Sequence, residues 1–126
     1  MDQFTLAYIE AALWSSTDDN DEPLDKNHGL NDLAPETLTK MQTDCEQFQA
    51  ECAEWLEQDY RTHARASHGC TVEESAGHDF WLTRCGHGAG FWDGDWQEPA
   101  ATKLTEASRR FGNVDLYLGD DGKIYS

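Results

Sequence analysis

The sequence has little positive charge and no long apolar run. Nine lysine and arginine residues stand against 25 aspartate and glutamate residues in 126, so the formal net charge is −16. Direct binding to nucleic acid is not expected, because phosphate contacts need clustered basic side chains. No stretch approaches the roughly 20 apolar residues of a membrane-spanning helix, and the N-terminus lacks a secretory signal. We therefore expect a cytoplasmic protein without membrane contacts.

Sequence motifs for binding metals or nucleotides are also missing. The chain has no C-x-x-C pair and no G-x-x-x-x-G-K-[ST] loop. Two close pairs, His68-x-Cys70 and Cys85-x-His87, are the nearest approach to a zinc site, and their spacing is poor for one. We therefore expect no cofactor. In a reducing compartment the cysteines are expected to be thiols, at Cys45, Cys52, Cys70 and Cys85.

The acidity is concentrated in one half of the chain. Residues 1–60 contain fifteen acidic residues and two lysines, whereas residues 61–126 contain ten acidic and seven basic residues. A chain of this length forms a single domain. We predict one domain over 1–126, with an acidic helical half at 1–65 and a second half of mixed secondary structure at 76–126.

Apolar periodicity predicts two helices in the acidic half. Residues 4–15 are apolar on nearly every face, which indicates a buried helix. A second helix is predicted from Pro35 to about His63, and the segment 16–32 between the two reads as a long acidic loop. The second helix has an apolar seam at spacings of three and four residues, formed by Leu38, Met41, Cys45, Phe48, Cys52 and Trp55.

The second half alternates in a way that is typical of strands. "HDFWLTR", the glycine-rich "CGHGAG" and "GFWDG" predict a β-hairpin. "EPAATKLTEASRRFG" predicts a third helix, and "VDLYLGDDGKIYS" predicts a second hairpin with Asp121-Gly122 at its turn. The expected fold is α+β, with three helices packed on a small antiparallel sheet of about four strands, arranged as two β-hairpins.

The acidic loop and second helix predict an extended anionic surface. A helix rises 1.5 Å per residue, so acids from Asp44 to Asp59 would span about 22 Å. Duplex DNA presents its phosphates as a comparable ribbon. An ordinary solvated helix face remains the competing interpretation. The candidate partner-binding residues are Asp18, Asp19, Asp21, Glu22, Asp25, Asp44, Glu46, Glu51, Glu54 and Glu57.

The predicted first hairpin offers a different candidate site. Carboxylates next to histidines are suited to a divalent cation, and Cys85 with His87 would be a nucleophile and base. No established catalytic motif accompanies them, so no residue is assigned as catalytic. The candidate ligand-loop residues are His78, Asp79, His87, Asp93 and Asp95.

Several sequence segments are specific enough to indicate similarity to a known family. With "AALWSSTDDNDEPLD", "LAPETLTKM", "HDFWLTR", "HGAGFWD" and "FGNVDLYLGDDGKIYS", the chain resembles a family of small acidic proteins encoded by bacteriophages and mobile elements. That family lacks an assigned activity, so the resemblance implies no catalytic residues. Cys85 stands where similar proteins have asparagine, which argues against a thiol mechanism. Small acidic phage proteins often antagonise host nucleases or other defence machinery, some by mimicking DNA.

Three functions follow as hypotheses. The first is a non-enzymatic phage-type accessory protein in the bacterial cytoplasm, which inhibits a host nucleic-acid-binding or defence protein by binding its basic surface, as a DNA mimic does. The second is a small enzyme, or a ligand- or metal-binding protein, that uses the hairpin from His78 to Asp95. The third is a structural or assembly protein whose acidity has no target.

Overall fold

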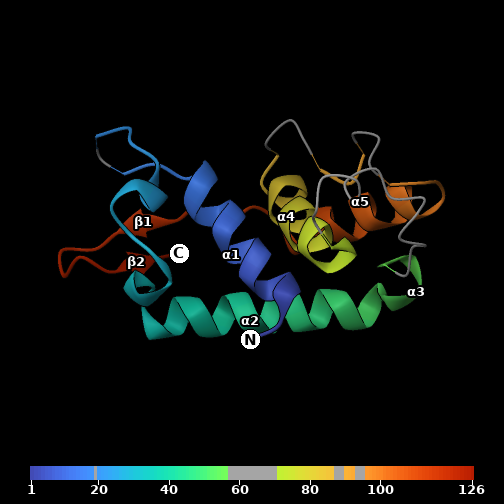
Figure 1. The fold of residues 1–126 in the computed structure, drawn as a ribbon, viewed down its shortest axis with the longest axis horizontal. Helices are drawn as coiled ribbons and strands as arrows, with labels where there is room; N and C mark the ends of the chain where they lie inside the picture. Colours follow the sequence, from blue (N-terminus) through green and yellow to red (C-terminus); the bar gives the residue numbers. More distant parts are fainter. Residues whose placement is uncertain (19, 57–70, 87–89, 93–95) are drawn as a thin grey trace.

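The computed structural model describes residues 1–18, 20–56, 71–86, 90–92 and 96–126 (Figure 1). Most of these residues are helical. Two short strands, β1 and β2, form an antiparallel pair in which Tyr117 faces Tyr125 and Leu118 faces Ile124. In chain order the elements are α1 (Gln3–Ser15), η1 (Leu24–Lys26), η2 (Leu30–Asp32), α2 (Pro35–Glu51), α3 (Ala53–Leu56), α4 (Val72–Arg84), α5 (Ala100–Phe111), β1 (Tyr117–Leu118) and β2 (Ile124–Tyr125).

The prediction of three helices on a four-stranded sheet is wrong. Five α-helices and one two-stranded sheet make up the described ranges. The predicted strand "HDFWLTR" forms the last two turns of α4 instead, so no first hairpin starts there. The second hairpin is confirmed in a shorter form, with Gly122 at a φ of 80° in its turn. The architecture is therefore a helical bundle with a hairpin attached.

Local signals explain why α4 is a helix. The Thr71 hydroxyl accepts a hydrogen bond from the backbone N–H of Glu74 (3.1 Å), which caps the first turn. Acidic residues in the first turn and Arg84 in the last turn complement the helix dipole. The helix ends before Gly86, whose φ of 69° favours glycine. These capping interactions outweigh the strand-like alternation of the segment.

The three predicted helices are confirmed within the described ranges. In α2 the apolar seam faces the core, with Met41, Cys45 and Phe48 fully buried. The helix is interrupted at Cys52, after which α3 adds one more turn; the predicted continuation to His63 lies outside the described residues. In α5 the Gly112 backbone, at a φ of 78°, terminates the helix as predicted.

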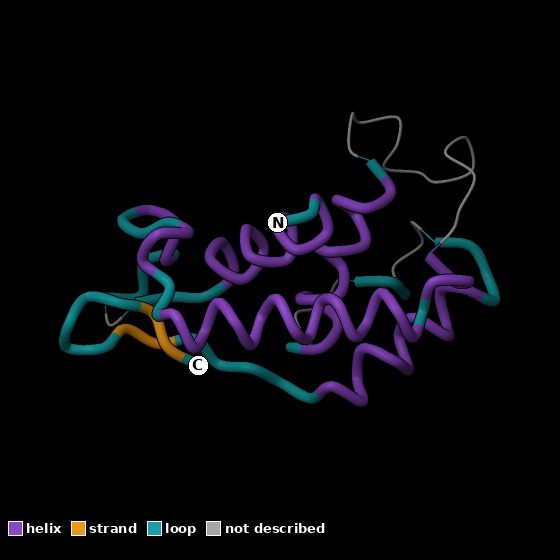
Figure 2. The backbone as a smooth tube through the Cα atoms, turned by 90° about the horizontal axis from the view of Figure 1, so that it is seen from below, coloured by secondary structure: helices purple, strands orange, loops and turns teal. Residues whose placement is uncertain are grey.

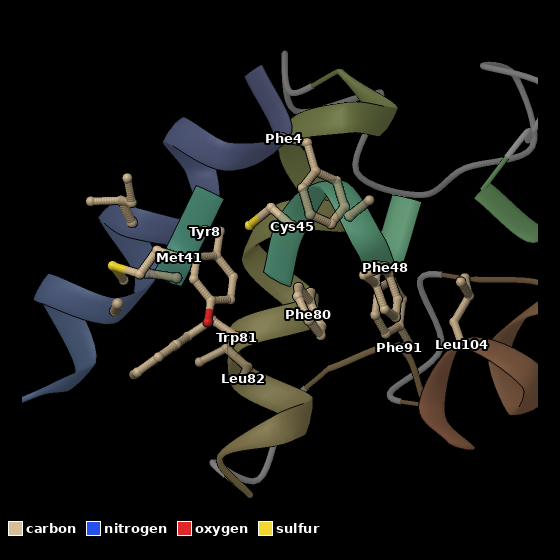
Figure 3. Packing of buried hydrophobic residues seen from close by; sticks show 14 of the residues in the cluster. Phe4, Tyr8, Met41, Cys45, Phe48, Phe80, Trp81, Leu82, Phe91 and Leu104 are labelled. Carbon is tan, nitrogen blue, oxygen red and sulfur yellow. The ribbon is translucent and has the colours of Figure 1, made fainter. Parts of the chain in front are cut away.

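A single aromatic core joins the two halves of the chain. The Phe48 ring of α2 stacks on the Phe80 ring of α4, with centroids 4.1 Å apart (Figure 3). Phe4 and Tyr8 of α1 also contact Phe80, with centroids 6.0 and 5.2 Å away, and Phe4 lies 5.9 Å from Phe48. Buried aromatic contacts of this kind each contribute about 0.5–1.5 kcal/mol beyond their area. The acidic half and the second half therefore fold as one unit around these rings.

The elements are unevenly distributed along the molecule. α2 runs along one side, with η1, η2 and the β-hairpin near one end and α3 and α5 toward the other (Figures 1 and 2). A parallel bridge links Leu33 to Ile124, and the backbone N–H of Ala34 donates to the carbonyl of Ile124 (3.0 Å). The acidic loop and the C-terminal hairpin, far apart in sequence, thus lie at the same end.

Replacing Asp2 with alanine is expected to lower the free energy of unfolding at pH 7 by about 1 kcal/mol. The Asp2 carboxylate caps α1 by accepting a hydrogen bond from the N–H of Thr5 (2.8 Å). Partial burial raises the pKa of Asp2, but the hydrogen bonds from Thr5 more than offset this and hold the pKa below its ordinary value of 3.8. Urea denaturation followed by tryptophan fluorescence measures the change.

The pH dependence of this difference is specific to the carboxylate. Because the folded pKa is the lower one, the stabilisation from ionised Asp2 is present above pH 3.8 and is lost as the pH falls through the folded pKa. The difference in the free energy of unfolding between the wild type and D2A should therefore become smaller at acidic pH. D2N is the control, since asparagine also caps helices. A gap that stays constant down to low pH would contradict the capping role.

Candidate functional site

The acidic end of the molecule is the candidate site; we define it as residues 16–36 and 115–126. Its described residues include nine acidic side chains and two lysines, whereas the rest of the described chain has eleven acidic and five basic side chains. Carboxylates are therefore least neutralised at this end. The nine are Asp18, Asp21, Glu22, Asp25, Asp32, Glu36, Asp115, Asp120 and Asp121.

Hydrogen bonds fix the described residues of the acidic loop in one shape. The Asp18 carboxylate accepts from the backbone N–H groups of Asn20 (2.8 Å) and Glu22 (3.1 Å). The N–H of Leu24 donates to the carbonyl of Ser16 (2.9 Å), and the Leu24 side chain is completely buried in the core. A loop anchored in this way presents its carboxylates at defined positions, because its backbone bonds are satisfied internally.

The C-terminal hairpin adds acidic and aromatic groups to the same end. The Tyr125 hydroxyl donates to the Asp121 carboxylate (2.6 Å), and this bond raises the pKa of Tyr125 to about 12 and lowers that of Asp121. The Tyr125 ring stacks on Tyr117, with centroids 6.0 Å apart. Tyr117 is 56% exposed. An exposed tyrosine, stacked on a half-buried one, therefore lies near the carboxylates of this end.

Sequence reasoning found only part of this site. The acidic loop was predicted, and Asp18, Asp21, Glu22 and Asp25 are all in the acidic end. Asp19 and Glu57 lie outside the described residues. The hairpin acids and the tyrosine pair were missed, although the acidic "GDDG" turn was visible, because nothing in the sequence places residue 124 beside residue 33.

Asp44 is not on the predicted surface. It is 3% exposed, and its carboxylate accepts hydrogen bonds from Arg84 Nη1 (2.8 Å) and Lys40 Nζ (2.7 Å). This correction has a simple cause. Asp44 follows Met41 by three residues and precedes Phe48 by four, so it occupies the seam of α2 rather than its solvated face.

The partner of Asp44 is a buried arginine that links four helices. Arg84 of α4 donates to the Tyr8 hydroxyl (3.1 Å) and, at the end of α5, to the carbonyls of Phe111 and Gly112 (both 2.8 Å). Its guanidinium also lies 5.5 Å from the centroid of the Phe80 ring. Burial lowers the pKa of Arg84, but Tyr8 and Asp44 more than offset this, so the pKa lies above its ordinary value. The network is structural, because the Arg84 side chain is only 2% exposed.

The remaining predicted acids of the second helix form a less coherent surface. Glu46, Glu51 and Glu54 are exposed on α2 and α3. Glu51 lines a hollow of about 220 Å³ together with the cationic side chains of Lys40 and Arg110. Positive charge therefore interrupts this face, whereas the acidic end has two lysines for nine described carboxylates.

The predicted ligand loop does not form the expected hairpin. His78 is half-buried on α4, where it packs against Trp14 of α1 with ring centroids 6.0 Å apart. Asp79 is completely buried and accepts a hydrogen bond from Trp96 Nε1 (2.7 Å). His87, Asp93 and Asp95 lie outside the described residues. Asp79 thus anchors a core tryptophan instead of facing a ligand.

Metal and thiol chemistry find no support in the described ranges. No three histidine, cysteine, aspartate or glutamate side chains gather there in a way that could hold a metal ion. Cys45, Cys52 and Cys85 are free thiols, and burial raises the pKa of Cys52 to about 11 and raises those of the other two. Cys70, His63 and His68 lie outside the described residues. None of the helices described combines the length and apolarity that a membrane crossing requires.

Fold and site together define a small helical protein with a fixed acidic end. No protein-family model matches the sequence, and comparisons with curated proteins and with solved structures find no match. Function therefore has to be argued from the surface itself, since a helical bundle alone implies no activity.

Proposed function

We propose that this chain is a non-enzymatic binding protein whose acidic end docks on a basic surface of another protein. The observation that carries the proposal is the internal bonding of the described loop residues, which holds Asp18, Asp21 and Asp25 in a fixed shape, while Glu22 is paired with Lys26 (2.9 Å). Concentrated negative charge steers association with basic surfaces. The resemblance to small acidic phage proteins supplies the class of partner: a host nucleic-acid-binding or defence protein, inhibited by an acidic end that occupies the place of DNA.

The stacked tyrosines can supply binding affinity, to which charge alone contributes little. Electrostatic complementarity contributes mainly specificity and association rate, whereas buried aromatic anchors contribute most of the affinity at protein interfaces. Tyr117 is exposed at the hairpin and is held by its contact with Tyr125. In the proposed complex, Tyr117 is the anchor and the surrounding carboxylates form the charged rim.

The two other hypotheses lack comparable support. The enzyme or ligand-binding alternative depended on a hairpin from His78 to Asp95, and the first part of that segment is helical with Asp79 in the core. The hypothesis of acidity without a target predicts that charge reversals have equal effects wherever they are made. That difference can be tested directly.

Reversing three charges at the acidic end is expected to reduce capture of the partner from a bacterial lysate by about tenfold or more. The variant combines E36K, D115K and D120K, all exposed side chains. The control combines E46K, E51K and E54K, which change the net charge equally on α2 and α3. Capture on the immobilised protein is quantified by mass spectrometry at about 50 and about 200 mM salt, with circular dichroism confirming that both variants fold.

The control should retain its partner. Capture by the wild type should weaken steeply with salt, and duplex DNA should compete with it, because a DNA mimic and DNA share one surface of the partner. Equal loss in both variants would show that only net charge matters and would contradict the proposal. Loss in the control alone would move the site to α2.

A further inference from the structure

A groove lies between α1 and the part of the acidic end that contains η1 and η2. Its volume is about 330 Å³, near the lower limit of small-ligand pockets, and its lining is mostly apolar. Leu6 of α1 and Leu30 of η2 remain 39% and 37% exposed along it. This size suits one side chain better than a whole peptide segment.

Two carboxylates give the groove a negative charge. Glu10 of α1 and Asp25 of η1 both line it and are both exposed. Neither side chain makes a hydrogen bond or an ion pair with any other described residue. The groove therefore combines an apolar lining with two acidic groups that come from different elements and with the imidazole of His28.

We propose that this groove binds one arginine side chain of the protein partner. The inference rests on the proposed function, since it places one contact of the docked basic surface. The apolar stem of arginine would cover Leu6 and Leu30. Its planar guanidinium, which is weakly hydrated and has five donors, would bond the carboxylates of Glu10 and Asp25. Lysine fits less well, because its ammonium is compact and strongly hydrated.

The test uses a defined probe and the whole chain. Nα-acetyl-arginine amide is titrated into ¹⁵N-labelled protein, and amide chemical shifts are followed by nuclear magnetic resonance. We expect saturable shifts centred on Leu6, Glu10 and Leu30. The citrulline analogue, which keeps the shape but not the charge, should bind at least about fivefold more weakly, and the lysine analogue should fall between the two.

Two paired variants separate the groove from the general acidity. E10Q combined with D25N should raise the Kd for the arginine probe about fivefold or more. E46Q combined with E54Q removes the same charge outside both the groove and the acidic end, and at moderate salt it should change the Kd by less than about twofold. Equal effects of both pairs, or equal binding of citrulline and arginine, would overturn the proposal. The leucines are tested by L30S, which should also weaken binding.

The groove and the proposed function can fail independently. The acidic-end variant E36K/D115K/D120K leaves both groove carboxylates in place, and the probe titration needs no partner. Loss of capture without arginine binding would remove the groove and keep the acidic end. Arginine binding without loss of capture would keep the groove and remove the acidic end as the docking surface.

Discussion

Replacing Arg84 with methionine is expected to lower the free energy of unfolding by about 3–5 kcal/mol, enough to unfold a marginal domain. The substitution keeps most of the side-chain volume but removes every hydrogen bond from the guanidinium. It leaves the Asp44 carboxylate buried, with only the exposed Lys40 as partner. It also deprives the carbonyls at the end of α5 of their donors. Urea denaturation at pH 7, followed by tryptophan fluorescence, measures the loss.

A double variant identifies the cause. In R84M combined with D44L the stranded carboxylate is gone, so part of the lost stability should return, as it does when a buried ion pair is replaced by apolar residues. K40A should cost less than about 1 kcal/mol, because Lys40 is largely exposed. If R84M and the double variant were equally destabilised, the isolated charge would not be the source of the loss.

The sequence was sufficient for elements whose apolar residues follow a clear period. The predicted seam repeats at three and four residues; Met41, Cys45, Phe48 and Cys52 are in the core, and Leu38 and Trp55 pack against it partly buried. The polar face opposite indicated which side is buried, except that Asp44 was assigned to the solvated side. α5 was equally clear, since its capping glycine marked the end of the helix. In these helices, solvent on one side produces a pattern that the sequence alone reveals.

α4 was misassigned because its sequence shows no contrast between an apolar face and a polar face. Five consecutive residues from Phe80 to Arg84 are buried, so the helical period disappears and a two-residue alternation is all that can be read. The information was present at the helix ends, in Thr71 with Glu74 and in Gly86, rather than in the apolar residues. Capping residues decide such cases, because they report the backbone conformation and not the exposure.

The acidic end required a contact that local reasoning does not provide. Leu33 and Ile124 are 91 positions apart, and their bridge, together with the hydrogen bond from Ala34 to Ile124, brings the hairpin to the same end as the loop. Similarly, the exposed Glu46 and the buried Asp44 look alike in composition, although one faces solvent and the other faces Arg84. Charge counts identified the acidic half, but tertiary contacts determine which carboxylates form a surface.

Replacing Gly77 with alanine is expected to destabilise the protein by about 3 kcal/mol, the upper part of the range for overpacked cores. Gly77 lies where α4 crosses α1, and a Cβ there would overlap the backbone carbonyl of Phe4. A backbone atom cannot rotate away as a side chain does, so the two helices would have to separate. The rings of Phe4 and Tyr8, which pack on Phe80, would then lose contact. The gain in helix propensity, about 1 kcal/mol, is too small to compensate.

Gly29→Ala is the matched control, because a Cβ at Gly29 meets no heavy atom within 4 Å and the backbone there is extended, with a φ of −141°. That variant should stay within about 0.5 kcal/mol of the wild type. The same urea titration compares the two. G77A should also expose the aromatic rings, seen as a red shift of tryptophan emission if the helices part before global unfolding. A loss of stability below about 1 kcal/mol in G77A would show that α1 and α4 do not pack backbone to backbone. It would also contradict the description of a core shared by the two halves of the chain.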